Sequence, residues 1–268
     1  MITTDYVPGT PCWVDLGAPD VAATAGFYRT VFGWEFESYG AEAGDYGAFK
    51  AGGKTVGAIG PLTEQGARSA WTIYFQTPDA DAAAQAVEKA GGSVRAAPFD
   101  VMGEGRMAQF TDPQGGQFAV WQPGSTKGLE AVDDTGSLSW TELYTPNAAG
   151  AKAFYGSVFG WSTQDMPLPG GNEGTYVILT PAGQPPERMF GGLMEMPSEY
   201  LTLAGGKAYW HPVFNTADCD ATVARVTANG GSVQMGPEDA EGVGRMAVCL
   251  DPNGADFVLL TPEPTPGS

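Results

Sequence analysis

Hydrophobic and polar residues alternate with two different periods along the chain. Several short segments alternate with the period of two that is typical of half-buried strands. In the first 61 residues these segments are 12–17, 46–50 and 55–61. Asp20 precedes a stretch of helical periodicity that ends at Gly33. The apolar face of this stretch is formed by Val21, Phe27, Val31 and Phe32. The pattern therefore predicts a strand, a helix capped by Asp20, and further strands.

The next segment follows the same plan. A strand is predicted over residues 71–77 and a helix from about Asp79 to Ala90, where Gly91 and Gly92 end it. Further strands are predicted at 93–96, 107–111 and 117–122. Each unit is thus read as β-α-β-β-β. Helices on one side of largely antiparallel strands predict the α+β class.

The whole pattern occurs twice. Phe27–Tyr28, followed by Phe32–Gly33–Trp34, returns as Phe154–Tyr155, followed by Phe159–Gly160–Trp161. Residues 71–123 recur as 210–262. A repeat of this length indicates two tandem domains of one fold. We predict domains at 1–123 and 138–262, a solvated linker at 124–137 and a disordered tail at 263–268.

Charge and cysteine content narrow the function classes. The chain has 31 acidic and 13 basic residues and a net charge of −18. The electrostatic field of a protein with this net charge repels nucleic acids and anionic membranes, and it weakly attracts cationic small molecules. The three cysteines form no CxxC pair, no signal peptide is recognisable, and no apolar run reaches the roughly 18 residues of a membrane span. We expect a cytoplasmic monomer or homodimer whose partner is a small organic ligand.

The motifs resemble a known family. Each repeat has a helix capped by Asp20 or Asn147, then Phe–Tyr, Gly–Trp and a later Asp–Pro–x–Gly before the last strand. This order resembles the vicinal oxygen chelate superfamily, which includes glyoxalase I, bleomycin-resistance proteins and extradiol dioxygenases. More closely, the chain is similar to tandem two-domain glyoxalase-like proteins. The resemblance implies that two β-α-β-β-β units curl into a cup, with a divalent metal at its base in the family's enzymes.

The family's metal-ligand positions carry unsuitable residues in this sequence. The resemblance places its first ligand at Trp13 and Trp140, and an indole N–H cannot coordinate a metal. The second falls on Thr72 and His211, the third on Ala119 and Val258, and an optional fourth near Gly60 and Glu195. We therefore expect no metal and no other cofactor. His211 is the only histidine in the chain, and we interpret it either as a buried, hydrogen-bonded imidazole or as a proton carrier.

Strand alternation predicts which side chains enter each cup. Asp15 and Glu142, each two residues after a tryptophan, are candidate acid–base residues, together with His211. Aromatic and polar neighbours suit a flat, partly polar organic ligand. The candidate ligand-binding residues are Trp13, Trp140, Tyr74, Gln76, Tyr144, Trp121, Arg106 and Arg245. For the two arginines the alternative is ion pairs with Asp100 and Asp239, or with Glu104 and Glu241.

Three functions fit these patterns. The first is a binding protein with a degenerate metal site that holds an aromatic or cationic ligand in Trp-lined cups. The second is a metal-independent isomerase, lyase, cyclase or hydroxylase-like enzyme of secondary metabolism that uses Asp15 or Glu142. The third is a metal-dependent glyoxalase or dioxygenase centred on His211. The sequence also leaves open whether each cup forms from adjacent or from exchanged units.

Overall fold

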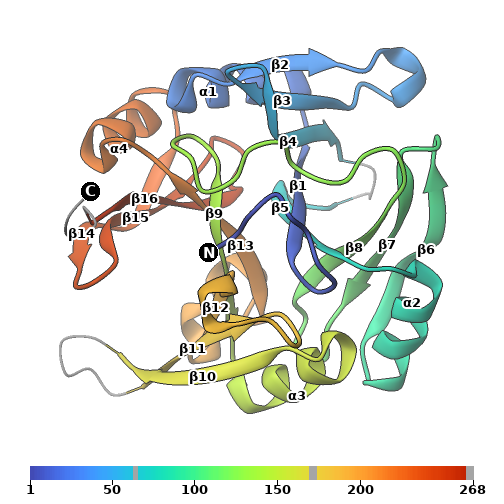
Figure 1. The fold of residues 1–268 in the computed structure, drawn as a ribbon. Coiled ribbons are helices and arrows are strands. Elements are labelled where there is room, and N and C mark those ends of the chain that lie inside the picture. The colour runs from blue at the N-terminus through green and yellow to red at the C-terminus, as the bar shows by residue number, and fades with distance from the viewer. Residues whose placement is uncertain (63–65, 169–173, 264–268) are drawn as a thin grey trace. The chain divides into compact units, whose positions relative to one another are not determined.

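The computed structural model describes residues 1–62, 66–168 and 174–263. Within them, four α-helices accompany two eight-stranded mixed sheets (Figure 1). The strand orders are β2-β3-β4-β1-β5-β8-β7-β6 and β10-β11-β12-β9-β13-β16-β15-β14. The predicted α+β class and the tandem duplication of one fold are confirmed. Each sheet is built from two β-α-β-β-β segments that are adjacent in the sequence.

The elements of the two repeats correspond one to one. The helices are α1 Val21–Phe32, α2 Ala80–Lys89, α3 Ala148–Phe159 and α4 Cys219–Ala228. The strands of the first repeat are β1 Pro11–Ala18, β2 Glu35–Ser38, β3 Gly47–Ala51, β4 Lys54–Pro61, β5 Ala70–Gln76, β6 Ser93–Val101, β7 Gly105–Thr111 and β8 Gln117–Pro123. Those of the second are β9 Leu138–Thr145, β10 Ser162–Pro167, β11 Thr175–Thr180, β12 Gly191–Glu195, β13 Tyr209–Asn215, β14 Ser232–Ala240, β15 Gly244–Leu250 and β16 Asp256–Pro262.

Local chemistry sets the helix ends as the sequence predicted. The Asp20 side chain accepts a hydrogen bond from the Ala23 N–H, and Gly33 ends α1 with φ of 78°. Asn147 and Gly160 do the same for α3. The pattern did not locate β2, because all four of its residues are exposed and no buried face marks the strand.

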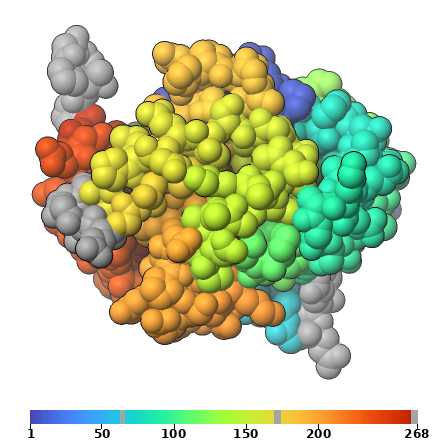
Figure 2. All heavy atoms as spheres, turned by 90° about the horizontal axis from the view of Figure 1, so that it is seen from below, coloured from blue at the N-terminus to red at the C-terminus, as the bar shows by residue number. Residues whose placement is uncertain are grey.

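Grouped by spatial contacts, the chain divides into two compact units, called unit 1 and unit 2 from here on, whose boundaries differ from those of the two sequence repeats. Unit 1 comprises Met1–Trp13, Thr72–Gly128 and Trp140–Trp210, and unit 2 comprises Val14–Trp71, Leu129–Ser139 and His211–Ser268. Each compact unit therefore contains one β-α-β-β-β segment from either repeat. In unit 1 α2 packs on α3, whose surfaces adjoin in Figure 2, and in unit 2 α1 packs on α4.

An aromatic core with a buried polar network fills unit 1. The ring of Phe75 contacts Phe118, Phe159, Trp161, Phe190 and Trp210. Inside this core Trp210 Nε1 donates to Tyr155 Oη over 2.8 Å, and Tyr155 Oη donates to Asp112 Oδ2 over 2.9 Å. The Tyr of the Phe–Tyr motif in one repeat thus binds the Asp of the Asp–Pro motif in the other.

Unit 2 contains the equivalent network with longer bonds. Trp71 Nε1 donates to Tyr28 Oη over 3.1 Å, and Tyr28 Oη lies 3.4 Å from Asp251 Oδ2. Burial raises the pKa of Tyr28 and of Tyr155 well above the ordinary value, and burial likewise raises the pKa of Asp112 and Asp251. The motifs that identify the family therefore tie the two repeats together inside each compact unit.

The linker between the repeats differs from the expectation of a solvated connection. Leu129, Ala131 and Val132 are buried in unit 2, and Glu130 Oε2 accepts hydrogen bonds from Thr55 N and Thr55 Oγ1. The prediction weighed the acidic and small residues of this stretch and overlooked its three apolar ones. The predicted tail lies outside the described residues from position 264 onward. No helix in the described ranges has the length and apolarity required to cross a membrane.

Candidate functional site

The first strands of the repeats show which face carries the candidate residues. Along β1, Val14 and Leu16 are buried, whereas Trp13, Asp15 and Gly17 keep part of their surface exposed. This alternation separates a core face from a second face, called the cup face here. The neighbouring β5 agrees, because Phe75 lies in the aromatic core and Tyr74 and Gln76 therefore point to the opposite side.

On the cup face of unit 1, three side chains form a continuous hydrogen-bonded chain. Trp140 Nε1 donates to Tyr176 Oη over 2.8 Å, and Tyr176 Oη donates to Glu142 Oε1 over 2.6 Å. Glu142 is buried, with 8% of its surface exposed. We call Trp140, Glu142 and Tyr176 the Glu142 cluster. Burial, and next the charge of Glu142, raise the pKa of Tyr176 well above its ordinary value, so this phenol stays protonated and serves as a donor.

The first repeat contains the same pair in unit 2. Tyr46 Oη donates to Asp15 Oδ2 over 3.3 Å. Asp15 lies beside Ala58 in the parallel β1–β4 pair, as Glu142 lies beside Gly192 in the β9–β12 pair. Sequence reasoning missed both tyrosines, because no motif marks them. Tyr176 lies on β11, and Tyr46 immediately precedes the equivalent strand β3. Their equivalence follows only from the strand register.

A glycine beneath each tyrosine gives the ring its space. A Cβ on Gly60 would lie 2.7 Å from Cδ2 of Tyr46, and a Cβ on Gly192 would overlap Oη of Tyr176. The two glycines are not equivalent, because in the register of each sheet Gly60 corresponds to Met194 and Gly192 to Ala58. Each repeat thus reaches the same Tyr–carboxylate pair through a glycine at a different position.

We predict that Gly192→Ala disrupts the Glu142 cluster. The added methyl group overlaps the Tyr176 hydroxyl, so overpacking should lower the free energy of unfolding by about 1–3 kcal/mol and break the bond to Glu142. Gly156→Ala is the matched control, since a Cβ there meets nothing within 4 Å and removing a helical glycine stabilises by roughly 0.5–1 kcal/mol. Chemical denaturation of both variants measures the difference. Equal stability of the two variants would contradict the assigned packing.

Unit 2 buries the only histidine beside a carboxylate. His211 on β13 has no exposed surface, and its Nδ1 lies 3.0 Å from Oδ2 of Asp256 on β16. Asp256 Oδ1 in turn lies 3.4 Å from Nη2 of Arg68, whose Nη1 donates to the Gly254 carbonyl. We call His211, Asp256 and Arg68 the His211 cluster. Of the two interpretations of His211, the structure shows the buried, hydrogen-bonded imidazole, and its carboxylate partner also suits proton transfer.

The aromatic candidates of the first repeat lie together in unit 1. Tyr74 and Trp121 are buried and pack with Cys12 and Ala119, and Trp13 lies half-buried against them. We call Cys12, Tyr74, Ala119 and Trp121 the first-repeat wall. Trp121 Nε1 donates to the Thr126 carbonyl. Tyr144 of the second repeat instead makes an edge-to-face contact with Tyr209, their ring centres 5.7 Å apart.

The two arginines are engaged in ion pairs. Arg106 Nε and Nη2 donate to both oxygens of Asp81 over 2.9 and 3.0 Å, and its Nη1 donates to Asp100 over 3.1 Å. Arg245 makes the equivalent bonds to Asp220 and Asp239. Of the alternatives for these residues, the geometry shows the ion pair with Asp100 and Asp239, and it adds a helix carboxylate that the sequence reasoning missed. The guanidinium groups are not aimed at the cup-face clusters.

The donor set does not fit the divalent metal of the family's enzymes. Trp140 donates to a phenol, Ala119 and Val258 have no donor atom, and Glu195 accepts a hydrogen bond from the Ala148 N–H at the start of α3. In the part of the chain that the structure describes, no three His, Cys, Asp or Glu side chains group as metal ligands. A catalytic zinc site typically uses three.

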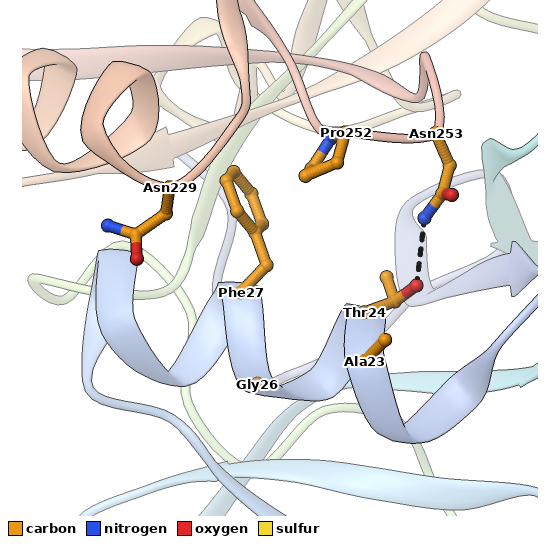
Figure 3. A pocket seen from close by; sticks show the side chains of 7 residues that line it. All are labelled: Ala23, Thr24, Gly26, Phe27, Asn229, Pro252 and Asn253. Atoms are coloured by element: carbon orange, nitrogen blue, oxygen red, sulfur yellow. Dashed lines mark hydrogen bonds between the residues drawn. The ribbon is translucent and has the colours of Figure 1, made fainter.

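A shallow groove of about 300 Å³ lies along α1 in unit 2 (Figure 3). Phe27 and Thr24 of α1 face Asn229, Pro252 and Asn253 across it, and Asn253 Nδ2 donates to Thr24 Oγ1. The groove contains no titratable side chain and no member of the clusters above. It is therefore not a candidate for acid–base chemistry.

Comparison with known proteins agrees with this architecture. The chain is 40% identical over 273 residues to the anthracycline biosynthesis protein DnrV of Streptomyces peucetius, covering 96% of this chain and 94% of that protein. It resembles the 2,3-dioxygenase LapB from Pseudomonas sp. KL28, with a TM-score of 0.65, 15% identity and coverage of 97% and 96%. The Mn(II)-bound glyoxalase from Novosphingobium aromaticivorans gives a TM-score of 0.62 at 19% identity, with coverage of 94% and 82%.

The two solved structures show the fold alone at these identities. A family model described as Glyoxalase/Bleomycin resistance protein/Dioxygenase superfamily matches residues 12–120 and again residues 137–259, which together make up most of the chain. The duplicated β-α-β-β-β plan, the relative at 40% identity and this double match agree with one another. The chain belongs to the Glyoxalase/Bleomycin resistance protein/Dioxygenase superfamily.

Proposed function

We propose that this protein binds a flat, partly polar aromatic molecule without a metal, and that the Glu142 cluster is its polar anchor. The observation that carries the proposal is the chain from Trp140 through Tyr176 to Glu142, with bonds of 2.8 and 2.6 Å. Trp140 stands where the resemblance to the family places its first metal ligand. An indole face, a phenol and a carboxylate held in one orientation suit an aromatic ligand that carries hydroxyl or amino groups.

The relatives suggest a ligand class. A relative at 40% identity is named for anthracycline biosynthesis, and anthracyclines join a flat ring system to a cationic amino sugar. The net charge of −18 favours the approach of such a cation, and a buried carboxylate suits an ammonium or phenol donor. We therefore infer that the ligand is a polycyclic aromatic compound of secondary metabolism.

A metal-free enzyme is the second candidate, and a specific observation favours it. The His211 cluster places an imidazole on a carboxylate that an arginine also contacts, which is an arrangement that holds and passes a proton. Glu142 or Asp15 would accept or donate a proton at its carboxylate oxygen, with the tyrosine hydroxyl holding that carboxylate in place. The reactions open to such groups are isomerisation, elimination or cyclisation of an aromatic substrate.

The first test measures metal content and ligand binding on the same preparation. Elemental analysis of protein purified without chelator or histidine tag should show no stoichiometric divalent metal. A hydroxyanthraquinone and a cationic anthracycline, added separately, should then quench tryptophan fluorescence with a Kd of about 1 μM or lower, which corresponds to about −8 kcal/mol. We expect the cationic compound to bind more tightly at low salt. A retained metal, or the absence of binding by both compounds, would contradict the proposal.

A further inference from the structure

The segment before β1 lies on the first-repeat wall. Tyr6 packs against the cluster of Cys12, Tyr74, Ala119 and Trp121, together with half-buried Trp13. These residues belong to unit 1, as does the whole segment of residues 1–10, called the arm here. The aromatic surface expected to receive a ligand therefore already contacts a phenol ring from the same chain.

Several bonds hold the arm in this position. Gly9 N donates to the Gln76 carbonyl, and Gln76 N donates to the Thr10 carbonyl, which attaches the arm to β5. Trp161 Nε1 donates to the Gly9 carbonyl over 2.9 Å. At the outer end, Arg188 binds both the carboxylate and the carbonyl of Asp5. The arm is thus fixed near β5 by backbone bonds. Farther out, Arg188 holds Asp5, the Met1 ammonium donates to the Glu187 carbonyl, and Ile2 is buried.

The ring of Tyr6 is enclosed on a second side by the residues that follow β8. A Cβ on Gly128, whose φ is 154°, would overlap the Tyr6 ring, so only a glycine leaves room there. Burial raises the pKa of Tyr6 above its ordinary value, and burial likewise raises the pKa of Cys12. The Tyr6 ring is therefore partly buried between the first-repeat wall and Gly128.

An unsatisfied acceptor lies close by. The amide oxygen Oε1 of Gln76 is buried and has no hydrogen-bond partner among the described residues. In the parallel β5–β8 pair Gln76 lies beside Trp121, and Tyr74 lies beside Ala119. A buried amide oxygen without a donor is destabilising, and the hydroxyl or ammonium group of a ligand would supply the donor.

We propose that the first-repeat wall is a binding site for a phenolic ring, and that Tyr6 is its internal occupant in the ligand-free protein. An aromatic ligand binds there only when the arm carries Tyr6 away, and Gln76 then accepts the ligand's hydroxyl hydrogen. The inference rests on the proposed function, since it concerns the same aromatic ligand class. Under this proposal, a ligand can reach the Glu142 cluster in the ligand-free protein, whereas Tyr6 covers the first-repeat wall.

The test is the Tyr6→Ala variant of the full chain. Phenol, which replaces the deleted ring, should bind the variant and raise its Tm by more than it raises the wild-type Tm. Calorimetric titration with a hydroxyanthraquinone should give one equivalent for the wild-type protein and two for the variant. Arg188→Gln keeps Tyr6 but removes the ion pair with Asp5, which should loosen the arm. Acrylamide should then quench tryptophan fluorescence more than in the wild type, and a second equivalent of the hydroxyanthraquinone should bind more tightly than to the wild type. Tyr200→Ala is the control, because Tyr200 is exposed and lies outside the wall.

The outcomes separate the two proposals. If Tyr6→Ala binds phenol but gains no equivalent of the hydroxyanthraquinone, Tyr6 is ordinary core packing and the inference is wrong, while the proposed function stands. If the wild-type protein binds nothing and Tyr6→Ala binds one equivalent, the Glu142 proposal fails and this inference holds. If Tyr6→Ala does not fold, Arg188→Gln decides, and unchanged quenching and affinity in that variant would overturn the inference.

Discussion

Tyr155→Phe should lower the free energy of unfolding by about 3 kcal/mol, because one hydroxyl group satisfies two buried partners. Without it the Trp210 N–H and the Asp112 carboxylate each lose a bond of 2.8 or 2.9 Å inside the aromatic core. A buried group left without a partner costs more than the net value of the bond itself. Urea denaturation followed by tryptophan fluorescence measures the change.

The equivalent variant in unit 2 is the internal comparison. Tyr28→Phe should cost less, about 1–2 kcal/mol, because its bonds to Trp71 and Asp251 are longer, at 3.1 and 3.4 Å. Tyr200→Phe, at an exposed position, should change the free energy of unfolding by no more than roughly 0.5 kcal/mol. A larger loss for Tyr28→Phe than for Tyr155→Phe would contradict the ranking of the two networks.

The effect of Tyr155→Phe should also depend on pH. Burial raises the pKa of Asp112 above its ordinary value, and the Tyr155 hydrogen bond is one of the contacts that lower it again. A carboxyl whose pKa is higher in the folded than in the unfolded state takes up a proton on folding, so its burial costs most above the folded pKa. Removing the hydroxyl raises that pKa further. The stability difference between wild type and variant should therefore be full above the folded pKa of Asp112 in the variant, and shrink as the pH falls through it.

Glu142→Gln should weaken binding of a cationic aromatic ligand by about tenfold to a hundredfold, or about 1.4–2.8 kcal/mol. The glutamine amide keeps the volume of the carboxylate but has no charge. Its NH2 group cannot accept the hydrogen bond that Tyr176 donates. Asp15→Asn makes the same change in the first repeat, where the tyrosine bond is 3.3 Å instead of 2.6 Å. We expect Asp15→Asn to change the affinity by no more than about twofold to threefold, which corresponds to about 0.5 kcal/mol.

Fluorescence titration of both variants, with denaturation curves as a control for folding, decides between the functions. If both variants lose affinity equally, both repeats bind the ligand in the unaltered protein. If neither variant loses affinity, Glu142 is not part of the binding site. If a substrate of the protein is found, retained affinity with lost turnover in Glu142→Gln would favour the acid–base enzyme over the binding protein.

The sequence predicted the fold well because its signals are local. Asp20 and Gly33 define a helix within a dozen residues, and the same residue types return at Asn147 and Gly160. Strand alternation also predicted that His211 faces the cup, and the structure places Asp256 of the neighbouring strand β16 within hydrogen-bonding distance of it. These relations depend on period and spacing, which one sequence displays directly.

The candidate site was harder to predict from the sequence than the fold, because its contacts depend on the register of neighbouring strands. Tyr176 meets Glu142 only because β11, β12 and β9 are neighbours in one sheet and Gly192 leaves room between them. Neither Tyr46 nor Tyr6 stands in a motif, and the residues after Pro123 looked like a solvated linker although Gly128 packs on Tyr6. Such pairings join residues far apart in the chain, and no periodicity reveals them.

The pairing of Tyr155 with Asp112, and of Tyr28 with Asp251, limits which changes this chain tolerates. Each repeat supplies half of both compact units, so neither repeat contains a complete hydrophobic core of its own. A chain that lost one repeat would expose the aromatic surface that both repeats now bury together. Substituting one member of either tyrosine–aspartate pair would leave the other member buried without this partner, so we expect the two positions of a pair to tolerate only joint changes.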